Sequence, residues 1–132
     1  MSLSCSFDFH ESSESSDAKE FVLNLPSGIR DKAGLLSQYE RAGKFPSYFG
    51  RNWDALSDLL RDLSWIAEER VVIVHKDVPL MDNEGDLLKY LCLLQDAVNS
   101  WKSSDGHQLV VIFPHESKEM ITRLLQHCES GD

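Results

Sequence analysis

The chain has 132 residues, a length typical of one domain, and its hydrophobic fraction of 42% can build a packed core without a metal or disulfide. Its formal net charge of −9 disfavours direct binding to DNA or RNA, because phosphate recognition generally uses a basic surface. An acidic protein is attracted instead to basic proteins, although acidity also serves solubility. The composition therefore favours a protein partner over a nucleic acid.

No apolar run approaches the roughly 20 residues that span a bilayer, and the N-terminus lacks the basic and apolar segments of a signal peptide. We therefore expect a cytoplasmic protein with no membrane association. Cys5, Cys92 and Cys128 form neither a CxxC pair nor a zinc-finger spacing. We interpret Cys92 as a small core residue on a helix and the other two as incidental, which suits a reducing compartment.

Residues 1–18 are rich in serine and acidic side chains and predict a loosely structured tail. Within it, Cys5, Phe7 and Phe9 alternate with polar residues, which leaves a short strand open as an alternative. From residue 19 to residue 132 the pattern is that of one globular domain.

The domain begins with a strand and two helices. Residues 21–25 predict the strand, and residues 31–42 predict a helix closed by Gly43. Residues 45–50 predict a loop, because proline and glycine interrupt them. Asn52 is a suitable N-cap for a second helix that runs to about Trp65 or Ala67.

Two strands and two helices complete the pattern. Residues 70–75 and 108–113 are continuous apolar runs typical of strands covered on both faces, and residues 87–101 and 117–127 have helical periodicity. Strands that alternate with helices indicate parallel pairing. The sequence therefore predicts an α/β fold with a single-layer, three-stranded parallel sheet packed with helices and an extra C-terminal helix.

The second helix carries an acidic stripe. Asp54, Asp58 and Asp62 follow one another at intervals of four residues, on the side opposite an apolar arc. Like charges at this spacing destabilise a helix by about 0.2–0.5 kcal/mol per pair. A solvated charged face is ordinary for a surface helix, so the stripe alone does not indicate a binding site.

The sequence around the stripe resembles the central segment of the barstar family: a proline, an aromatic pair and glycine, then asparagine, Asp-Ala-Leu and a second aspartate. The matching positions are Pro46, Tyr48, Phe49, Gly50, Asn52, Asp54, Ala55, Leu56 and Asp58. The order of predicted elements is similar from about Glu20 to Pro114. The resemblance implies a barstar-like fold and an inhibitor, rather than an enzyme, that is a monomer when free and needs no metal or cofactor.

The resemblance also implies a partner and a set of contacts. The partner is a basic, extracellular-type ribonuclease similar to barnase, whose active site the acidic helix and the preceding loop would block. Asp58 would occupy the phosphate pocket among basic side chains, a role that suits a carboxylate. Asp54 would pair with a neighbouring base, and Tyr48 would stack near the catalytic histidine. The remaining expected contact residues are Phe49, Gly50, Asn52, Ser57 and Asp96; Ser57 stands where the best-known members have tryptophan.

The sequence leaves a second class of function open and disfavours a third. A barstar-fold regulatory module that binds a different basic protein is the alternative, motivated by Ser57 and the terminal extensions. An enzyme is disfavoured, because the histidines form no HExxH motif and no serine lies in GxSxG. Asp77, Asp82, Glu84 and Asp86 lack the spacing of a calcium loop and are expected to be solvated.

Overall fold

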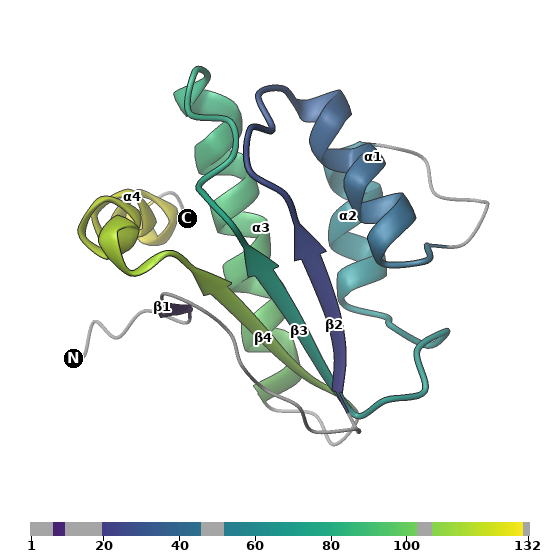
Figure 1. Ribbon diagram of the computed structural model, residues 1–132. Helices are drawn as coiled ribbons and strands as arrows, with labels where there is room; N and C mark the ends of the chain where they lie inside the picture. The colour runs from purple at the N-terminus through teal and green to yellow at the C-terminus, as the bar shows by residue number, and fades with distance from the viewer. Residues whose placement is uncertain (1–6, 10–19, 46–51, 103–106, 131–132) are drawn as a thin grey trace.

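A parallel sheet organises the computed structural model, which describes residues 7–9, 20–45, 52–102 and 107–130. Its strands lie in the order β1-β4-β3-β2, and every neighbouring pair is parallel (Figure 1). The strands are β1 (Asp8–Phe9), β2 (Glu20–Leu25), β3 (Arg70–His75) and β4 (Gln108–Phe113). The three longer strands confirm the predicted sheet, and β1 confirms the short strand that the alternation near Phe7 left open.

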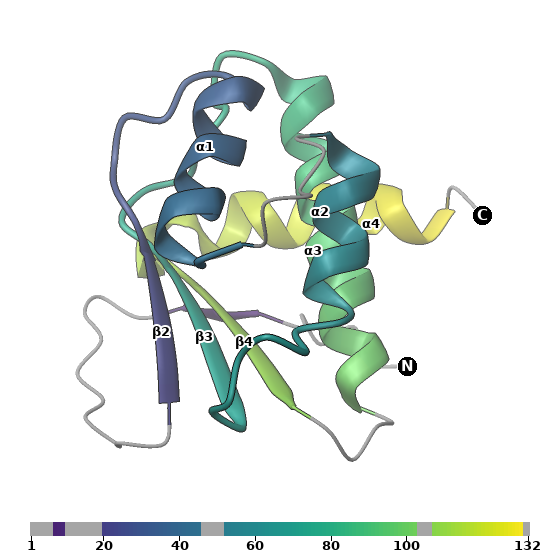
Figure 2. The same cartoon turned by 90° about the vertical axis from the view of Figure 1, so that its right-hand side faces the viewer.

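Three helices cover one face of this sheet, as Figure 2 shows. They are α1 (Lys32–Ala42), α2 (Trp53–Leu60) and α3 (Glu84–Lys102). After β4, a 3₁₀ turn (η1, His115–Ser117) leads into α4 (Lys118–Ser130), which packs against α3. The predicted C-terminal helix is therefore confirmed, and it begins one residue later than expected.

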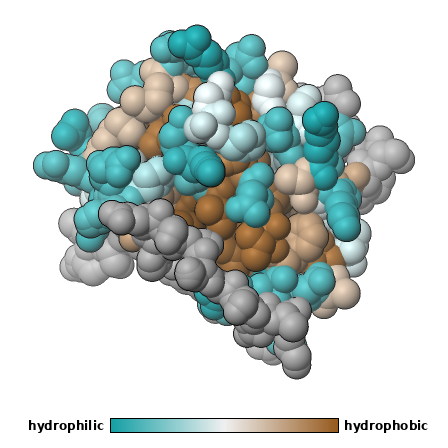
Figure 3. Space-filling model, viewed as in Figure 1, coloured by the Kyte–Doolittle hydropathy of each residue, from teal (hydrophilic) through white to brown (hydrophobic). Residues whose placement is uncertain are grey.

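The two faces of the sheet differ in what covers them. Leu23 and Leu25 of β2 are buried beneath the helices, whereas Val22 points the other way and is 39% exposed. Val22 is level with Val72 of β3 and Val110 of β4, so an apolar row crosses the second face. Figure 3, which looks onto that face, shows apolar surface in its centre with polar side chains around it.

A chain of hydrogen bonds joins three buried polar side chains in the core. His75 donates from Nδ1 to the carbonyl of Ile112 (3.0 Å), and its Nε2 accepts from the Tyr90 hydroxyl (2.7 Å). The Tyr90 oxygen in turn accepts from the Tyr39 hydroxyl (2.6 Å). Burial lowers the pKa of His75 to about 3, and it raises the pKa values of both tyrosines. The imidazole is therefore neutral and part of the packed core.

The prediction that the second helix continues to Trp65 or Ala67 is wrong, because α2 ends at Leu60. The chain turns at Leu63, which has a φ of 48° and donates its N–H to the Leu59 carbonyl (3.0 Å). A left-handed conformation is unfavourable for leucine. Here the Leu63 side chain is 1% exposed, so burial of the side chain offsets the backbone cost.

The interpretation of the cysteines is also wrong. Cys92 of α3 and Cys128 of α4 form a disulfide, with their Cα atoms 5.6 Å apart. The two residues are separated by 36 positions, and it is the packing of α4 on α3 that brings them together. Sequence spacing carried no sign of this pairing, because connectivity depends on the docking of whole helices.

Candidate functional site: the acidic face of α2

The start of α2 is fixed by a side-chain cap. Asn52 accepts a hydrogen bond at Oδ1 from the N–H of Ala55 (2.7 Å), which satisfies one of the free donors of the first turn. Asp54 lies in that same turn, where a carboxylate interacts favourably with the helix dipole. The predicted N-cap is therefore confirmed.

The outer side of α2 presents carboxylates to solvent. Asp54 and Asp58 are both exposed, while Leu56 and Leu60 on the opposite side are buried. Four residues correspond to about one turn, so their side chains are neighbours roughly 5–6 Å apart at Cβ. Asp62 lies beyond the end of the helix, where its Oδ2 accepts from the Ser64 hydroxyl (3.1 Å). The helical part of the acidic stripe therefore consists of Asp54 and Asp58.

Aromatic contacts hold α2 at both ends. At its start, Trp53 packs near Tyr90 of α3, with ring centroids 6.1 Å apart, and the Lys32 ammonium lies 5.4 Å from the Trp53 ring. At its end, the Trp101 indole N–H of α3 donates to the carbonyl of Leu60 (2.8 Å). The sequence alone does not mark Lys32 or Trp101 as supports of the acidic helix, because these contacts exist only once the helices pack.

The same contacts set the position of Asp96. Because Trp53 lies beside Tyr90 and Leu60 lies beside Trp101, α2 and α3 run side by side in the same direction. Asp96 of α3 is exposed and lies at about the level of Asp58 along this pair. Ser57 is half-buried on α2, between the exposed side and the buried side. Tyr48, Phe49 and Gly50, the predicted loop contacts, lie outside the described residues.

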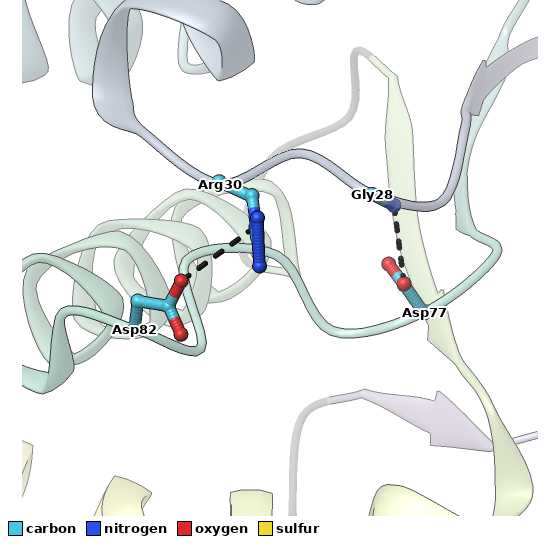
Figure 4. A network of polar contacts seen from close by, with 4 residues as sticks. All are labelled: Gly28, Arg30, Asp77 and Asp82. Carbon is cyan, nitrogen blue, oxygen red and sulfur yellow. Dashed lines mark hydrogen bonds and ion pairs between the residues drawn. The ribbon is translucent and has the colours of Figure 1, made fainter.

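The other acidic cluster makes contacts within the fold. Asp77 accepts at Oδ2 from the backbone N–H of Gly28 (3.2 Å), and Asp82 lies 3.6 Å from the Arg30 guanidinium (Figure 4). These contacts join the segment after β2 to the segment after β3. Within the described part of the chain, no group of three His, Cys, Asp or Glu residues is arranged to hold a metal ion. We therefore assign Asp77 and Asp82 a role in joining these two segments.

The histidines that follow sheet strands do not form a catalytic group in the described residues. His75 is enclosed by the hydrogen bonds given above, and His115 is exposed at the start of η1. His107 immediately precedes β4 in the chain, and its Nδ1 donates to the Glu68 carbonyl (2.9 Å). Among the described helices, none is long and apolar enough to cross a membrane.

The protein is a parallel α/β domain with an exposed acidic helix. This helix is capped at its start and held in place by aromatic side chains. The model of the family described as "Barstar (barnase inhibitor)" matches residues 18–114, more than half of the chain, so the chain belongs to the barstar family. The match includes α1, α2 and α3 and ends before η1 and α4. No curated protein and no solved structure was found to match the chain.

Proposed function

We propose that the protein inhibits a basic ribonuclease similar to barnase by placing α2 and the preceding loop in the active site of the nuclease. The observation that carries the proposal is the exposure of Asp54 and Asp58 on a helix that lies within the matched region. Asp58 is assigned to the phosphate pocket and Asp54 to a neighbouring base. Asp96, an exposed acid on the neighbouring helix α3, is assigned a further contact.

Preorganisation supports this assignment. The Asn52 cap, the Trp53 contacts and the Trp101 hydrogen bond fix the two carboxylates before a partner arrives, so less conformational freedom is lost on binding. An exposed ion pair contributes only about 0–1 kcal/mol. Close charge pairs between barnase and barstar, the inhibitor that gives this family its description, have measured couplings of about 1.5–7 kcal/mol. We expect Asp58, desolvated and surrounded by several cations, to contribute in the range of these close charge pairs rather than in that of an exposed ion pair.

Titration of a barnase-like ribonuclease with the purified protein tests the proposal. We expect stoichiometric loss of nuclease activity, and we expect Asp58→Ala to weaken inhibition by at least about 100-fold, equivalent to about 2.7 kcal/mol. Glu119→Ala, an exposed acid on α4, is the matched control and should inhibit as well as the wild type. Equal inhibition by Asp58→Ala and the wild type would reject the assigned role.

A second candidate is a regulatory module that binds a different basic protein. It is favoured by Ser57, which replaces an aromatic residue of the interface helix, and by α4, which follows the end of the family match. Capture of a basic partner other than a nuclease, by the wild type and not by Asp54→Ala with Asp58→Ala, would support it if ribonuclease activity is unaffected. In either role we propose a protein that is monomeric when free and cytoplasmic, a compartment in which the Cys92–Cys128 disulfide would be exposed to reductants.

A further inference from the structure

Phe45 and Trp53, which lie on either side of residues 46–52, pack on two tyrosines that are bonded to each other. The Phe45 ring lies against Tyr39 of α1, with ring centroids 5.8 Å apart. Trp53, the first residue of α2, lies against Tyr90 of α3, with ring centroids 6.1 Å apart. The hydroxyl oxygens of Tyr39 and Tyr90 are 2.6 Å apart in a hydrogen bond. One bond between two side chains therefore connects Phe45 to the start of the acidic helix.

The tyrosine pair is fixed to the sheet by hydrogen bonds with a defined direction. The carbonyl of Ile112 in β4 can only accept, so His75 carries its proton on Nδ1 and the Nε2 of the neutral ring accepts. The Tyr90 hydroxyl donates to that nitrogen (2.7 Å), which leaves its oxygen to accept from Tyr39. The chain of bonds thus runs from β4 through β3 and α3 to α1.

Hydrogen bonding sets the relative position of these rings more narrowly than apolar packing does. Both tyrosines are fully buried, so their hydroxyls must find partners inside the core. A hydrogen bond weakens steeply as its angle departs from linear, whereas the burial of apolar surface has no preferred direction. A buried polar network whose members are all satisfied therefore makes a core rigid. Phenylalanine at either position would bury the same ring and leave its position less restricted.

We propose that Tyr39 and Tyr90 are positioning residues for the nuclease-binding surface, because their hydrogen bond holds Phe45 and Trp53 at a fixed separation and orients the first turn of α2. Both tyrosines are buried, so they act through the residues packed on them and not by touching a partner. Asp54 follows Trp53 directly, so a shift of Trp53 displaces the carboxylate. The assignment rests on the proposed function of the acidic face, but its effect on the free protein can be measured separately.

Tyr39→Phe in the full-length chain tests the pair with the least disturbance. It keeps a ring against Phe45, and the Tyr90 hydroxyl still donates to His75, so no buried donor loses its acceptor. In the free protein, amide hydrogen exchange at residues 55–58 should be at least about fivefold faster, while exchange in β3 is unchanged. Inhibition of a barnase-like ribonuclease should be weaker by at least about tenfold, because more conformational freedom is lost on binding.

The matched control is Ser117→Ala, which also removes a buried hydroxyl that donates a hydrogen bond, here to the Pro114 carbonyl in front of η1 (2.7 Å). Its free energy of unfolding should fall to a similar extent, with inhibition and exchange at residues 55–58 as in the wild type. Trp53→Leu removes the ring that packs on Tyr90. In that background, Tyr39→Phe should weaken inhibition by no more than about threefold, because the two changes act on one connection.

Three results would overturn the proposal. The first is exchange at residues 55–58, or inhibition of the nuclease, that is the same in Tyr39→Phe and the wild type. The second is an equal effect of Ser117→Ala, which would mean that any loss of stability weakens the surface. The third is an undiminished effect of Tyr39→Phe in the Trp53→Leu background. A wild type that does not inhibit the nuclease would instead refute the proposed function, and exchange at residues 55–58 would then decide the positioning role alone.

Discussion

Trp101 of α3 donates its indole N–H to the carbonyl oxygen of Leu60, the last residue of α2, at 2.8 Å. This bond satisfies a carbonyl at the helix end that has no partner within the helix. It also connects α3 to the helix that carries Asp54 and Asp58. The position of the acidic face therefore depends on a residue 41 positions further along the chain.

The first prediction concerns this bond. Trp101→Phe keeps an aromatic ring but removes the donor, so the free energy of unfolding should fall by about 1 kcal/mol, the usual net value of one hydrogen bond. Amide exchange at residues 57–62 should become faster. Trp65→Phe is the control, because the Trp65 indole donates to Gly43 (3.0 Å) at the end of α1 and its loss should leave exchange in α2 unchanged. Unchanged exchange in the Trp101 variant would argue against a positioning role.

The second prediction concerns pH and the buried His75. In the unfolded chain the imidazole binds a proton below its ordinary pKa of about 6.5, whereas in the fold it stays neutral down to about pH 3. Between these values the unfolded state binds more protons, so stability falls as the pH falls. We expect a loss on the order of a few kcal/mol between pH 6.5 and pH 3.

The comparison that isolates His75 uses His75→Gln, whose amide can donate to Ile112 and accept from Tyr90 but does not titrate. Urea unfolding of both proteins at several pH values should give a smaller slope of stability against pH for the variant in the acidic range. Identical slopes would show that carboxylates elsewhere, and not the buried imidazole, cause the acid sensitivity.

The third prediction concerns the end of α1. Gly43, the C-cap, has an ordinary φ of −92°, and it is Lys44 that takes the left-handed conformation with a φ of 54°. Glycine adopts that conformation without the cost that lysine bears, so Lys44→Gly should be neutral to stabilising, by up to about 1 kcal/mol. Gly43→Ala should destabilise the fold, because its Cβ would lie 2.8 Å from the Tyr39 carbonyl oxygen. Thermal unfolding of the two variants distinguishes these effects, and the opposite order would contradict them.

The fourth prediction concerns electrostatic steering by the acidic face. Asp54→Asn with Asp58→Asn keeps the shape of α2 and removes two of its charges, so association with a basic ribonuclease should slow by about tenfold or more at low salt. The difference should shrink as salt is added, because exposed charges are screened. Stopped-flow association measured against ionic strength provides the test, with Glu119→Gln on α4 as the charge control. A double variant that associates as fast as the wild type would remove electrostatic steering from the mechanism.

Much of the fold could be predicted from local chemistry. The runs 70–75 and 108–113 form strands with the expected bounds, since continuous apolar residues suit a buried parallel sheet. Asp31 and Asn52 begin their helices through side-chain caps, which depend only on residues three positions away. Periodicity also separates the exposed Asp54 and Asp58 from the buried side of α2. The partner contacts assigned to these residues remain predictions.

Other features are decided by tertiary structure alone. Apolar periodicity continues through Leu63, yet α2 stops at Leu60 because the core buries Leu63 in a left-handed turn. The pairing of Cys92 with Cys128 and the Trp101–Leu60 bond join residues that are distant in the chain, so their spacing carries no information. A sequence encodes caps and periodicity through neighbouring residues. Which helices come to lie side by side is determined by the burial of the whole core.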